Sequence, residues 1–182
     1  MEAGMKMEIA GLGTTEITLP LKKSVPGKQG VLDGVPASGI VLLTGTIYTA
    51  RDAAHRRIAD MLAAGKEPPF PLDGAAIYYC GPAPAKPGET IGSCGPTSSS
   101  RMDALTLPLL ERGLKIMVGK GDRSAEVMAA TKKCGALYLK AIGGAAVYYK
   151  QFVKSCKLIA FPELGCEAVY ELYLEKFPII NL

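Results

Sequence analysis

Beyond residue 40, short apolar runs alternate with longer segments whose apolar residues recur every three or four positions. The short runs are typical of buried strands, and the recurring pattern is typical of helices with one face on a core. In 51–64, for example, Ala54, Ile58 and Leu62 fall on one helical face. The pattern predicts helices over 51–64, 98–112, 124–134 and 145–154, and strands over 40–48, 75–80, 114–118, 137–141, 158–161 and 169–177, where a short helix is an alternative for the last.

Glycine and proline mark the ends of several of these elements. Residues 81–96 are rich in both, which predicts a long, stiff loop, and loops of this kind are often functional. Thr97 or Ser98 is the expected N-cap of the helix that follows, and Gly113 lies just beyond its end. Pro108 falls inside this helix and predicts a kink or a break there.

The first 38 residues have a different character. Short alternating runs such as 15–19 predict two or three antiparallel strands, with turns at 26–27 and 33–34. Strand and helix then alternate four times, which favours a parallel sheet with helices packed on it. The leading strands favour a second sheet layer. We therefore expect one α/β domain that spans residues 1–182.

Charge and hydropathy narrow the classes of function. The formal net charge is +4, and the basic residues are spread along the chain, which argues against nucleic acid or an anionic membrane as a partner. The longest apolar stretch, 39–50, is too short to span a bilayer. The first residues show no signal-peptide core. These features predict a cytoplasmic protein.

The cysteines argue against a disulfide framework and against a metal site held by this chain alone. Their number, five, is odd, and no Cys-x-x-Cys pair occurs. Most are expected to be buried, reduced thiols. Cys94 lies in the Gly-rich loop, so a cysteine hydrolase that pairs it with His55 stays open as an alternative.

Three basic residues occupy positions where a positive charge is locally unfavourable. Arg51, Arg101 and Lys120 each lie at a junction that leads into a predicted helix. A helix N-terminus carries partial positive charge and free N–H donors, so cations there favour a nearby anion. All three lie beyond the carboxyl ends of predicted strands, where α/β sheets bind ligands. The sequence predicts a pocket for a dicarboxylate or a phosphate, although neither a G-x-G-x-x-G motif nor a P-loop is present.

Three neighbouring residues have both a structural and a chemical interpretation. Thr97 can cap its helix, or its hydroxyl can act as a general base beside a bound carboxylate, favoured by guanidinium groups and helix N–H donors. His55, the only histidine, can brace its helix, orient Arg51 or relay a proton. Asp52 is most simply an acid that interacts favourably with the helix dipole.

Five segments together resemble the class I fumarate hydratase family. They are 50–55 (Ala-Arg-Asp-Ala-Ala-His), 79–82 (Tyr-Cys-Gly-Pro), 91–103 (Ile-Gly-Ser-Cys-Gly-Pro-Thr-Ser-Ser-Ser-Arg-Met-Asp), 119–121 (Gly-Lys-Gly) and 143–146 (Gly-Gly-Ala-Ala). More narrowly, the chain resembles the β subunit of the two-subunit form, which is shared with L(+)-tartrate dehydratase. The Gly-Pro-Thr-x-x-x-Arg-Met-Asp element is the most specific part of the resemblance.

This resemblance implies a swivelling β/β/α fold with a parallel central layer, an antiparallel layer and a helical layer. It also implies an oxygen-sensitive hydro-lyase that acts on a dicarboxylate and is active only with an α subunit, in an α2β2-type assembly. The α subunit would hold a 4Fe–4S cluster and supply the acid group, so this chain would bind no metal. Arg51, Arg101 and Lys120 would bind the substrate carboxylates, and Thr97 would be the catalytic base.

Several alternatives stay open. Hydration of fumarate to malate is the first expectation and dehydration of L(+)-tartrate to oxaloacetate is the second, and the serines at 98–100 could bear on that choice. A phosphohistidine carrier that uses His55 and a non-catalytic anion-binding module are alternatives of other classes. The loop 81–96 is our candidate for part of the face that contacts the α subunit.

Overall fold

The computed structural model describes residues 13–21, 32, 35 and 38–181 of the chain. The described strands are β1 (Thr14–Leu19), β2 (Gly39–Thr49), β3 (Ala76–Tyr78), β4 (Ile116–Gly119), β5 (Leu137–Lys140), β6 (Val153–Ala160) and β7 (Val169–Asn181). The α-helices are α1 (Asp52–Ala63), α2 (Asp103–Glu111), α3 (Ala125–Lys133) and α4 (Ala146–Tyr149). Short 3-10 helices occupy Ser99–Met102, Lys150–Phe152 and Pro162–Glu167.

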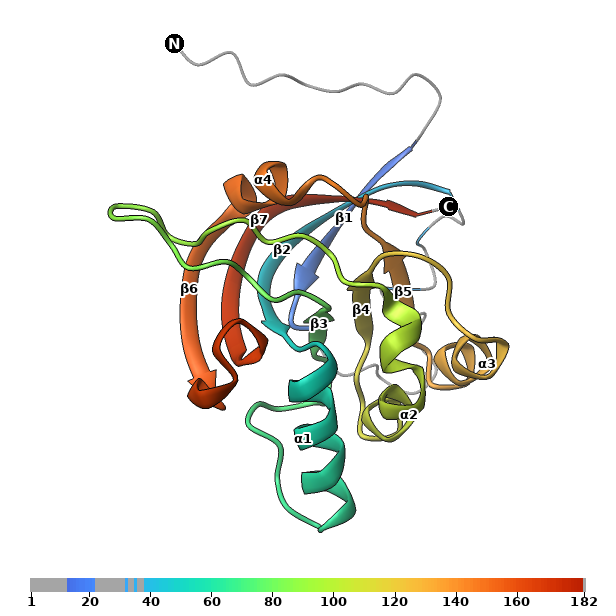
Figure 1. Ribbon diagram of the computed structural model, residues 1–182. Coiled ribbons are helices and arrows are strands. Elements are labelled where there is room, and N and C mark those ends of the chain that lie inside the picture. The colour runs from blue at the N-terminus through green and yellow to red at the C-terminus, as the bar shows by residue number, and fades with distance from the viewer. Residues whose placement is uncertain (1–12, 22–31, 33–34, 36–37, 182) are drawn as a thin grey trace.

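The seven strands form one mixed sheet, in which β7 pairs with β2 as well as with β5 and β6. β1, β2, β3, β4 and β5 pair in parallel in that order. β7 is antiparallel to β2, β5 and β6, so it connects the last parallel strand back to β2. Figure 1 shows the result, with β6 and β7 curving over one side and α1, α2 and α3 gathered on the other.

Two apolar cores lie on opposite faces of the central parallel strands. In β3, the side chains of Ala76 and Tyr78 join one core, and Ile77 between them joins the other. The first core is completed by β1, β2, β6 and β7, and the second by α1 and α2. Because β3 and β4 are buried on both faces, their sequences are continuous apolar runs, as predicted.

Most predicted elements are confirmed within one to three residues, but the N-terminal layer is not. Residues 14–19 form a strand, yet this strand runs parallel to β2 rather than antiparallel to a neighbour. The antiparallel partner of β2 is β7, from the other end of the described chain. A local alternating pattern indicates a strand but carries no information about its partner. The turns predicted at 26–27 and 33–34 lie outside the described residues.

The helix predicted over 98–112 is composed of two parts. A 3-10 turn covers Ser99–Met102, and the α-helix begins at Asp103 and continues through Pro108 without a break. The structure therefore contradicts a break at Pro108 and places the change of helix type earlier, between Met102 and Asp103. Gly113, at φ 99°, ends the helix as expected. Ser98 is the N-cap residue of the 3-10 turn, as one of the two predicted candidates, but its side chain makes no capping hydrogen bond.

The C-terminal third contains more strand than predicted. The helix expected over 145–154 is limited to α4 and one 3-10 turn, and Val153 already begins β6. β6 has a mixed pattern of buried and exposed positions because it pairs with β7 at the edge of the sheet. Residues 169–181 are a strand throughout, which decides against the short helix.

Candidate active site

The Gly-Pro-Thr segment is inserted between the ends of two parallel strands. The backbone N–H of Thr97 donates to the carbonyl of Tyr79, just beyond β3, at 2.6 Å. On the other side, the N–H of Lys120 donates to Thr97 O at 3.1 Å, and the N–H of Ser99 donates to Lys120 O at 2.9 Å. Thr97 and Lys120 are therefore held side by side at the carboxyl ends of β3 and β4, where α/β sheets bind ligands.

A glycine makes this insertion possible. A Cβ atom on Gly119, the last residue of β4, would collide with Ser99 Oγ and would lie 2.7 Å from the ring carbon Cδ2 of Tyr79. Only a residue without a side chain leaves room for the segment at this point. The Gly-Lys-Gly sequence at 119–121 thus has a structural reason for its first glycine.

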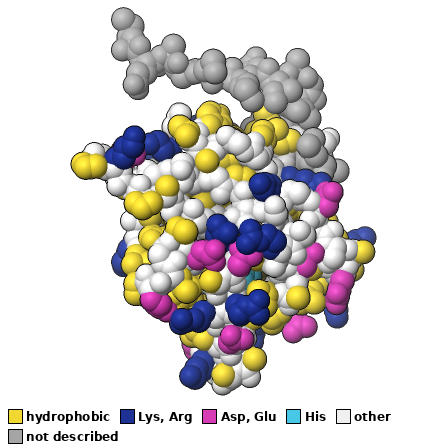
Figure 2. Space-filling view, in the orientation of Figure 1, with side chains coloured by type: hydrophobic (Ala, Val, Ile, Leu, Met, Phe, Trp, Pro, Cys, Tyr) yellow, Lys and Arg dark blue, Asp and Glu magenta, His cyan; other side chains and the backbone are white. Residues whose placement is uncertain are grey.

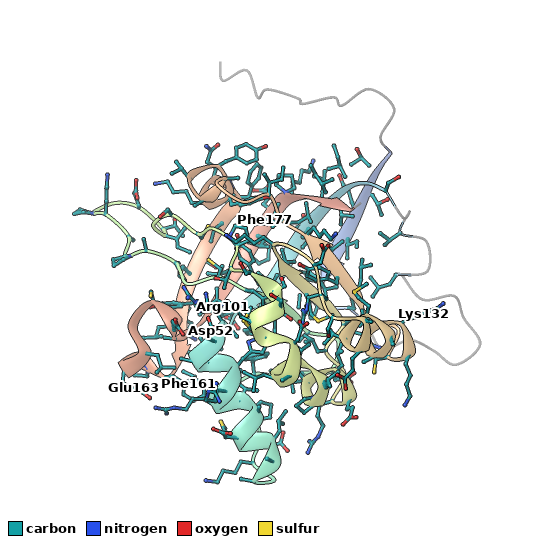
Figure 3. The ribbon with its side chains drawn as sticks, turned by 45° about the vertical axis from the view of Figure 1, so that its right-hand side comes forward. Asp52, Arg101, Lys132, Phe161, Glu163 and Phe177 are labelled. Carbon is teal, nitrogen blue, oxygen red and sulfur yellow. The ribbon has the colours of Figure 1, made fainter. Side chains whose placement is uncertain are left out.

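Asp52 brings two of the predicted arginines together. Its Oδ1 lies 2.8 Å from Arg101 Nε, and its Oδ2 lies 3.3 Å from Arg51 Nε. Figure 3 shows Asp52 and Arg101 adjacent at the N-terminal end of α1. Among the described residues, the terminal nitrogens of both guanidinium groups have no protein partner. Each arginine is therefore anchored through Nε and keeps the pair of donors that can hold a carboxylate.

Glu167 provides a second anchor for Arg51. Its Oε1 lies 3.2 Å from Arg51 Nε, and its Oε2 accepts a hydrogen bond from the N–H of Ala53 at 2.9 Å. A carboxylate at this helix N-terminus interacts favourably with the helix dipole. The unfavourable position of Arg51, which suggested a bound anion, is thus compensated in part by protein carboxylates. The sequence did not indicate this contact, because Glu167 is remote from Arg51 in the chain.

The charges in this region are mixed, with a surplus of cations. Partial burial favours the protonated form of Asp52, but hydrogen bonds from its own backbone N–H and from Arg51, with the charge of Arg101, lower its pKa overall. Asp52 and Glu167 offset part of the positive charge of Arg51, Arg101 and Lys120. Figure 2 shows Lys and Arg side chains beside Asp and Glu side chains near the middle of one face.

Lys120 lies directly beyond β4 and has no ion-pair partner among the described residues. Its Cδ would lie 3.6 Å from a Cβ on Gly143, so the Gly-Gly loop after β5 leaves space beside it. The prediction that all three cations stand at helix N-termini is only partly right. Arg51 directly precedes α1, but Arg101 lies in the 3-10 turn, and Lys120 lies well before α3.

The Thr97 side chain is available for chemistry. The residue is buried, with 9% of its surface exposed, and its hydroxyl has no hydrogen-bond partner in the part of the chain described. It does not cap a helix, since the chain on either side of it pairs with Tyr79 and Lys120 as a strand would. The structural interpretation of Thr97 as an N-cap is therefore wrong.

His55 is buried in α1 below the arginines. Neither ring nitrogen has a hydrogen-bond partner among the residues that the structure describes, and the ring meets Tyr79 edge-on at 5.2 Å between centroids. Burial, helped by the charge of Arg123, lowers the pKa of His55 from 6.5 to about 4. A neutral, fully buried imidazole supports the interpretation of His55 as a brace. It does not suit a phosphohistidine carrier, which must present its imidazole to a donor protein.

We predict that His55 makes stability depend on pH. Its pKa near 4 in the folded chain lies below the ordinary value of 6.5, so its contribution is complete above pH 6.5 and is lost as the pH falls toward 4. The full loss is roughly 3 kcal/mol, at about 1.4 kcal/mol per pKa unit. Urea midpoints measured between pH 4 and 8 should fall less steeply for His55→Gln than for the unchanged chain. Parallel curves would contradict the prediction.

The cysteines do not form a reactive or metal-binding centre in the described residues. Cys94 is fully buried, and burial followed by the nearby Cys156 raises its pKa to about 12. A thiol with so high a pKa is a poor nucleophile, which argues against the cysteine hydrolase. No group of three or more His, Cys, Asp or Glu side chains in the described ranges is arranged to hold a metal ion.

Arg123 is the residue near the site that the sequence analysis missed. Its side chain is fully buried, and its Nε lies 2.6 Å from Asp103 Oδ1. An arginine that follows a loop aspartate looks like a surface residue, and only its distant partners show otherwise. The one available signal was Asp103, an acid at a helix start within the Gly-Pro-Thr-x-x-x-Arg-Met-Asp element.

Comparison with known proteins identifies the family. The family model described as "Fumarase C-terminus" matches residues 10–182. The chain is 40% identical over 169 residues to "Fumarate hydratase 2" of Leishmania major, covering 92% of this chain and 30% of that protein. It is 43% identical over 154 residues to "Fumarate hydratase class I, anaerobic" of Escherichia coli strain K12, covering 83% of this chain and 28% of the relative.

A shorter relative matches along most of its own length. A protein of Methanocaldococcus jannaschii assigned as L(+)-tartrate dehydratase subunit beta is 38% identical over 147 residues, which is 78% of this chain and 75% of that protein. The chain thus spans less than a third of the two fumarate hydratases. No helix in the described ranges is long and apolar enough to cross a membrane. The match over residues 10–182 and the shorter relative place this chain in the fumarase C-terminal domain family.

Proposed function

We propose that this chain is the β-subunit part of a hydro-lyase that reversibly adds water to fumarate to form malate. The observation that carries the proposal is the joint anchoring of Arg51 and Arg101 on Asp52. Thr97, whose hydroxyl has no hydrogen-bond partner among the described residues, is held beside Lys120 at the ends of β3 and β4. Two guanidinium groups with free terminal donors suit a ligand that carries carboxylates. The fumarate hydratases among the relatives support this choice of substrate.

The chemistry needs a base and a stabilised carboxylate from this chain. In malate dehydration, deprotonated Thr97 Oγ1 takes a proton from the carbon next to one carboxylate. The C–H electrons form the double bond, and the hydroxyl leaves as water after it takes a proton from an acid of the partner. Arg51, Arg101 and Lys120 stabilise the negative charge that grows on the carboxylates. Hydration of fumarate follows the same path in reverse.

We place the 4Fe–4S cluster in an α-type partner subunit. The described residues of this chain do not fit a cluster, since no suitable group of ligands is present and burial raises the pKa of both Cys80 and Cys94. The fumarate hydratases extend well beyond the matched region, so there is room in them for a further domain that performs this role. An α2β2-type assembly in the cytoplasm remains our expectation for the two-subunit form.

The partner would meet a face beside the site. The loop 81–96 contacts α4 where the N–H of Cys94 donates to Ala146 O at 3.2 Å. Beside this contact, Ile142, Val147 and Tyr148 are exposed apolar side chains. Exposed apolar side chains near the charged residues of the site favour a protein neighbour that completes it.

We further propose that residues 1–182 form one domain with the swivelling β/β/α fold. The two cores on either side of the parallel strands support this assignment. One core separates the central strands from β7 and its neighbours, and the other separates them from the helices. This order of layers is the one that the resemblance implies.

Dehydration of L(+)-tartrate to oxaloacetate is the second candidate. It is favoured by the relative assigned as a tartrate dehydratase subunit, which matches this chain over most of its length. Of the serines at 98–100, only some are placed to distinguish tartrate from fumarate. The hydroxyl of Ser99 is hydrogen-bonded to that of Tyr138 at 2.7 Å, and Ser99 is buried. Ser98 and Ser100 are therefore the side chains that can contact a substrate.

The test is anaerobic co-expression of this chain with an α-type subunit, followed by cluster reconstitution. Fumarate hydration and L-tartrate dehydration are then measured for the pair and for each chain alone. Turnover by the pair only supports a split hydro-lyase and ranks the two substrates. A stable, cluster-loaded pair that is inert on both would reject both substrates. If no complex formed and this chain alone bound citrate, the anion-binding module would be favoured.

A further inference from the structure

We propose that Arg123 is a positioning residue that holds the catalytic segment 97–102 in place from the buried side of the segment. The inference rests on the proposed function for its consequence in catalysis, but its structural content can be measured without turnover. Arg123 lies in the loop between β4 and α3, and its side chain is fully buried. It therefore does not touch the substrate and acts through its neighbours.

The guanidinium group of Arg123 has a protein partner at each of its three nitrogens. Nε meets Asp103 Oδ1 at 2.6 Å, Nη1 donates to the hydroxyl of Tyr79 at 2.8 Å, and Nη2 donates to Thr106 Oγ1 at 2.9 Å. Its central carbon also lies 5.2 Å from the ring centroid of Tyr79 and 5.3 Å from that of Tyr138. A planar guanidinium group that is bonded at all three nitrogens and contacts two rings is held in one orientation.

Each of these partners is also bonded to the catalytic segment or adjoins it. The carbonyl of Tyr79 accepts from the N–H of Thr97, and Thr106 Oγ1 donates to Met102 O at 2.8 Å. Asp103 follows Met102 directly and begins α2. The hydroxyl of Tyr138 donates to Gly121 O at 2.7 Å and is also hydrogen-bonded to Ser99 Oγ at 2.7 Å.

Arg123 thus connects four elements beneath the site. Through Asp103 and Thr106 it holds α2, and through the two tyrosines it reaches the end of β3 and strand β5. Asp103 also accepts from the N–H of Ser124 at 2.7 Å, which closes the link back to α3. The segment that carries Thr97 and Arg101 is therefore held by hydrogen bonds that converge on one buried cation.

Replacing Arg123 with lysine tests the planar set of donors separately from the positive charge. Arg123→Lys keeps the buried positive charge beside Asp103 but cannot serve Tyr79, Thr106 and Asp103 together in one plane. If Arg123 served only to neutralise Asp103, lysine would replace it. If it positions the segment, the segment loosens although the domain stays folded.

The experiment compares Arg123→Lys with the unchanged chain in two measurements. Hydrogen exchange by mass spectrometry on the isolated chain should show the amides of Thr97 and Ser99 exchanging roughly tenfold or more faster, because their local opening becomes easier. The β2–β7 amides should be unchanged. In the assembled enzyme, kcat should fall about 100-fold, with a smaller change in KM, because misplacing a catalytic group by about 1 Å has effects of that size.

Arg57→Lys is the matched control. Arg57 also combines an ion pair, 2.9 Å from Glu163, with a ring contact, 5.4 Å from the centroid of Phe161, but it is half exposed and away from the segment. This variant should match the unchanged chain in exchange and in kcat. Arg123→Lys that behaves like Arg57→Lys in the exchange of residues 97–102 would overturn the inference.

Tyr138→Phe is the second test variant, to be used if Arg123→Lys does not fold. It removes only the hydroxyl that reaches Ser99 Oγ and Gly121 O, and keeps the ring against Arg123. It should speed the exchange of Ser99 more than that of Thr97, and an unchanged Ser99 amide would overturn the inference. If the unchanged assembly had no activity, the proposed function would fail while the exchange data still decided the role of Arg123.

Discussion

Arg101→Ala is expected to lower kcat/KM of the assembled enzyme roughly 10²- to 10⁴-fold, which corresponds to a loss of about 3 to 5 kcal/mol of transition-state stabilisation. The change removes two terminal donors that would hold a substrate carboxylate, and it also leaves Asp52 with Arg51 as its remaining arginine partner. Steady-state rates for both fumarate and L-tartrate measure the loss. Arg101→Lys should be intermediate, because it keeps the charge but not the paired donors.

Arg57→Ala is a suitable comparison for this loss. It removes an arginine of α1 that lies away from segment 97–102. The ion pair of Arg57 with Glu163 is about half exposed on both sides. Such pairs contribute at most about 1 kcal/mol to stability, so the activity should stay close to that of the unchanged enzyme. Equal activities for the two alanine variants would remove Arg101 from the substrate site.

Thr97→Ala should lower kcat by about 10²- to 10⁴-fold, the usual range for the loss of a general base. KM should change much less, because the carboxylates would still be held by Arg51, Arg101 and Lys120. Thr97→Ser keeps the hydroxyl and should recover most of the rate. Incorporation of deuterium from solvent into malate reports the proton transfer directly and should fall with kcat in Thr97→Ala.

Thr18→Ala serves as the control for threonine replacement. Thr18 is exposed on β1, far in sequence from the site, and its loss should leave kcat unchanged. If Thr97→Ala kept its kcat and its deuterium incorporation with the cluster intact, the proton would have to move through another group. In that case the unpartnered hydroxyl of Thr97 would need a different explanation.

The candidate site could be predicted largely because its residues are unusual for their local surroundings. Arg51 before a helix, and Thr97 after Gly-Pro, stand out in any reading of the sequence. The role of Asp52 could not be found in this way, because an acid at a helix start is ordinary. Its second partner, Arg101, comes from a separate segment, and only the folded chain shows that one carboxylate serves both arginines.

The same distinction explains the errors in the fold. Most strands and helices after residue 40 follow local patterns, either a continuous apolar run or apolar residues at every third or fourth position, so they were predicted within a few residues. The segment predicted as a helix over 145–154 is the main exception. The partner of each strand is a long-range property, and the parallel pairing of β1 with β2 could not be deduced from an alternating run. Arg123 was missed for a related reason, since Tyr79, Thr106 and Tyr138 approach it from three other elements.

The return of β7 to β2 has a consequence for how this chain folds. Pairs such as Ile40 with Ile180 join residues far apart in the chain, and contacts of this kind make folding slow. During synthesis, one edge of β2 stays unpaired until β7 has been made. An unpaired edge is a site where strands of other chains can add. The chain should therefore be most vulnerable to aggregation just before β7 leaves the ribosome.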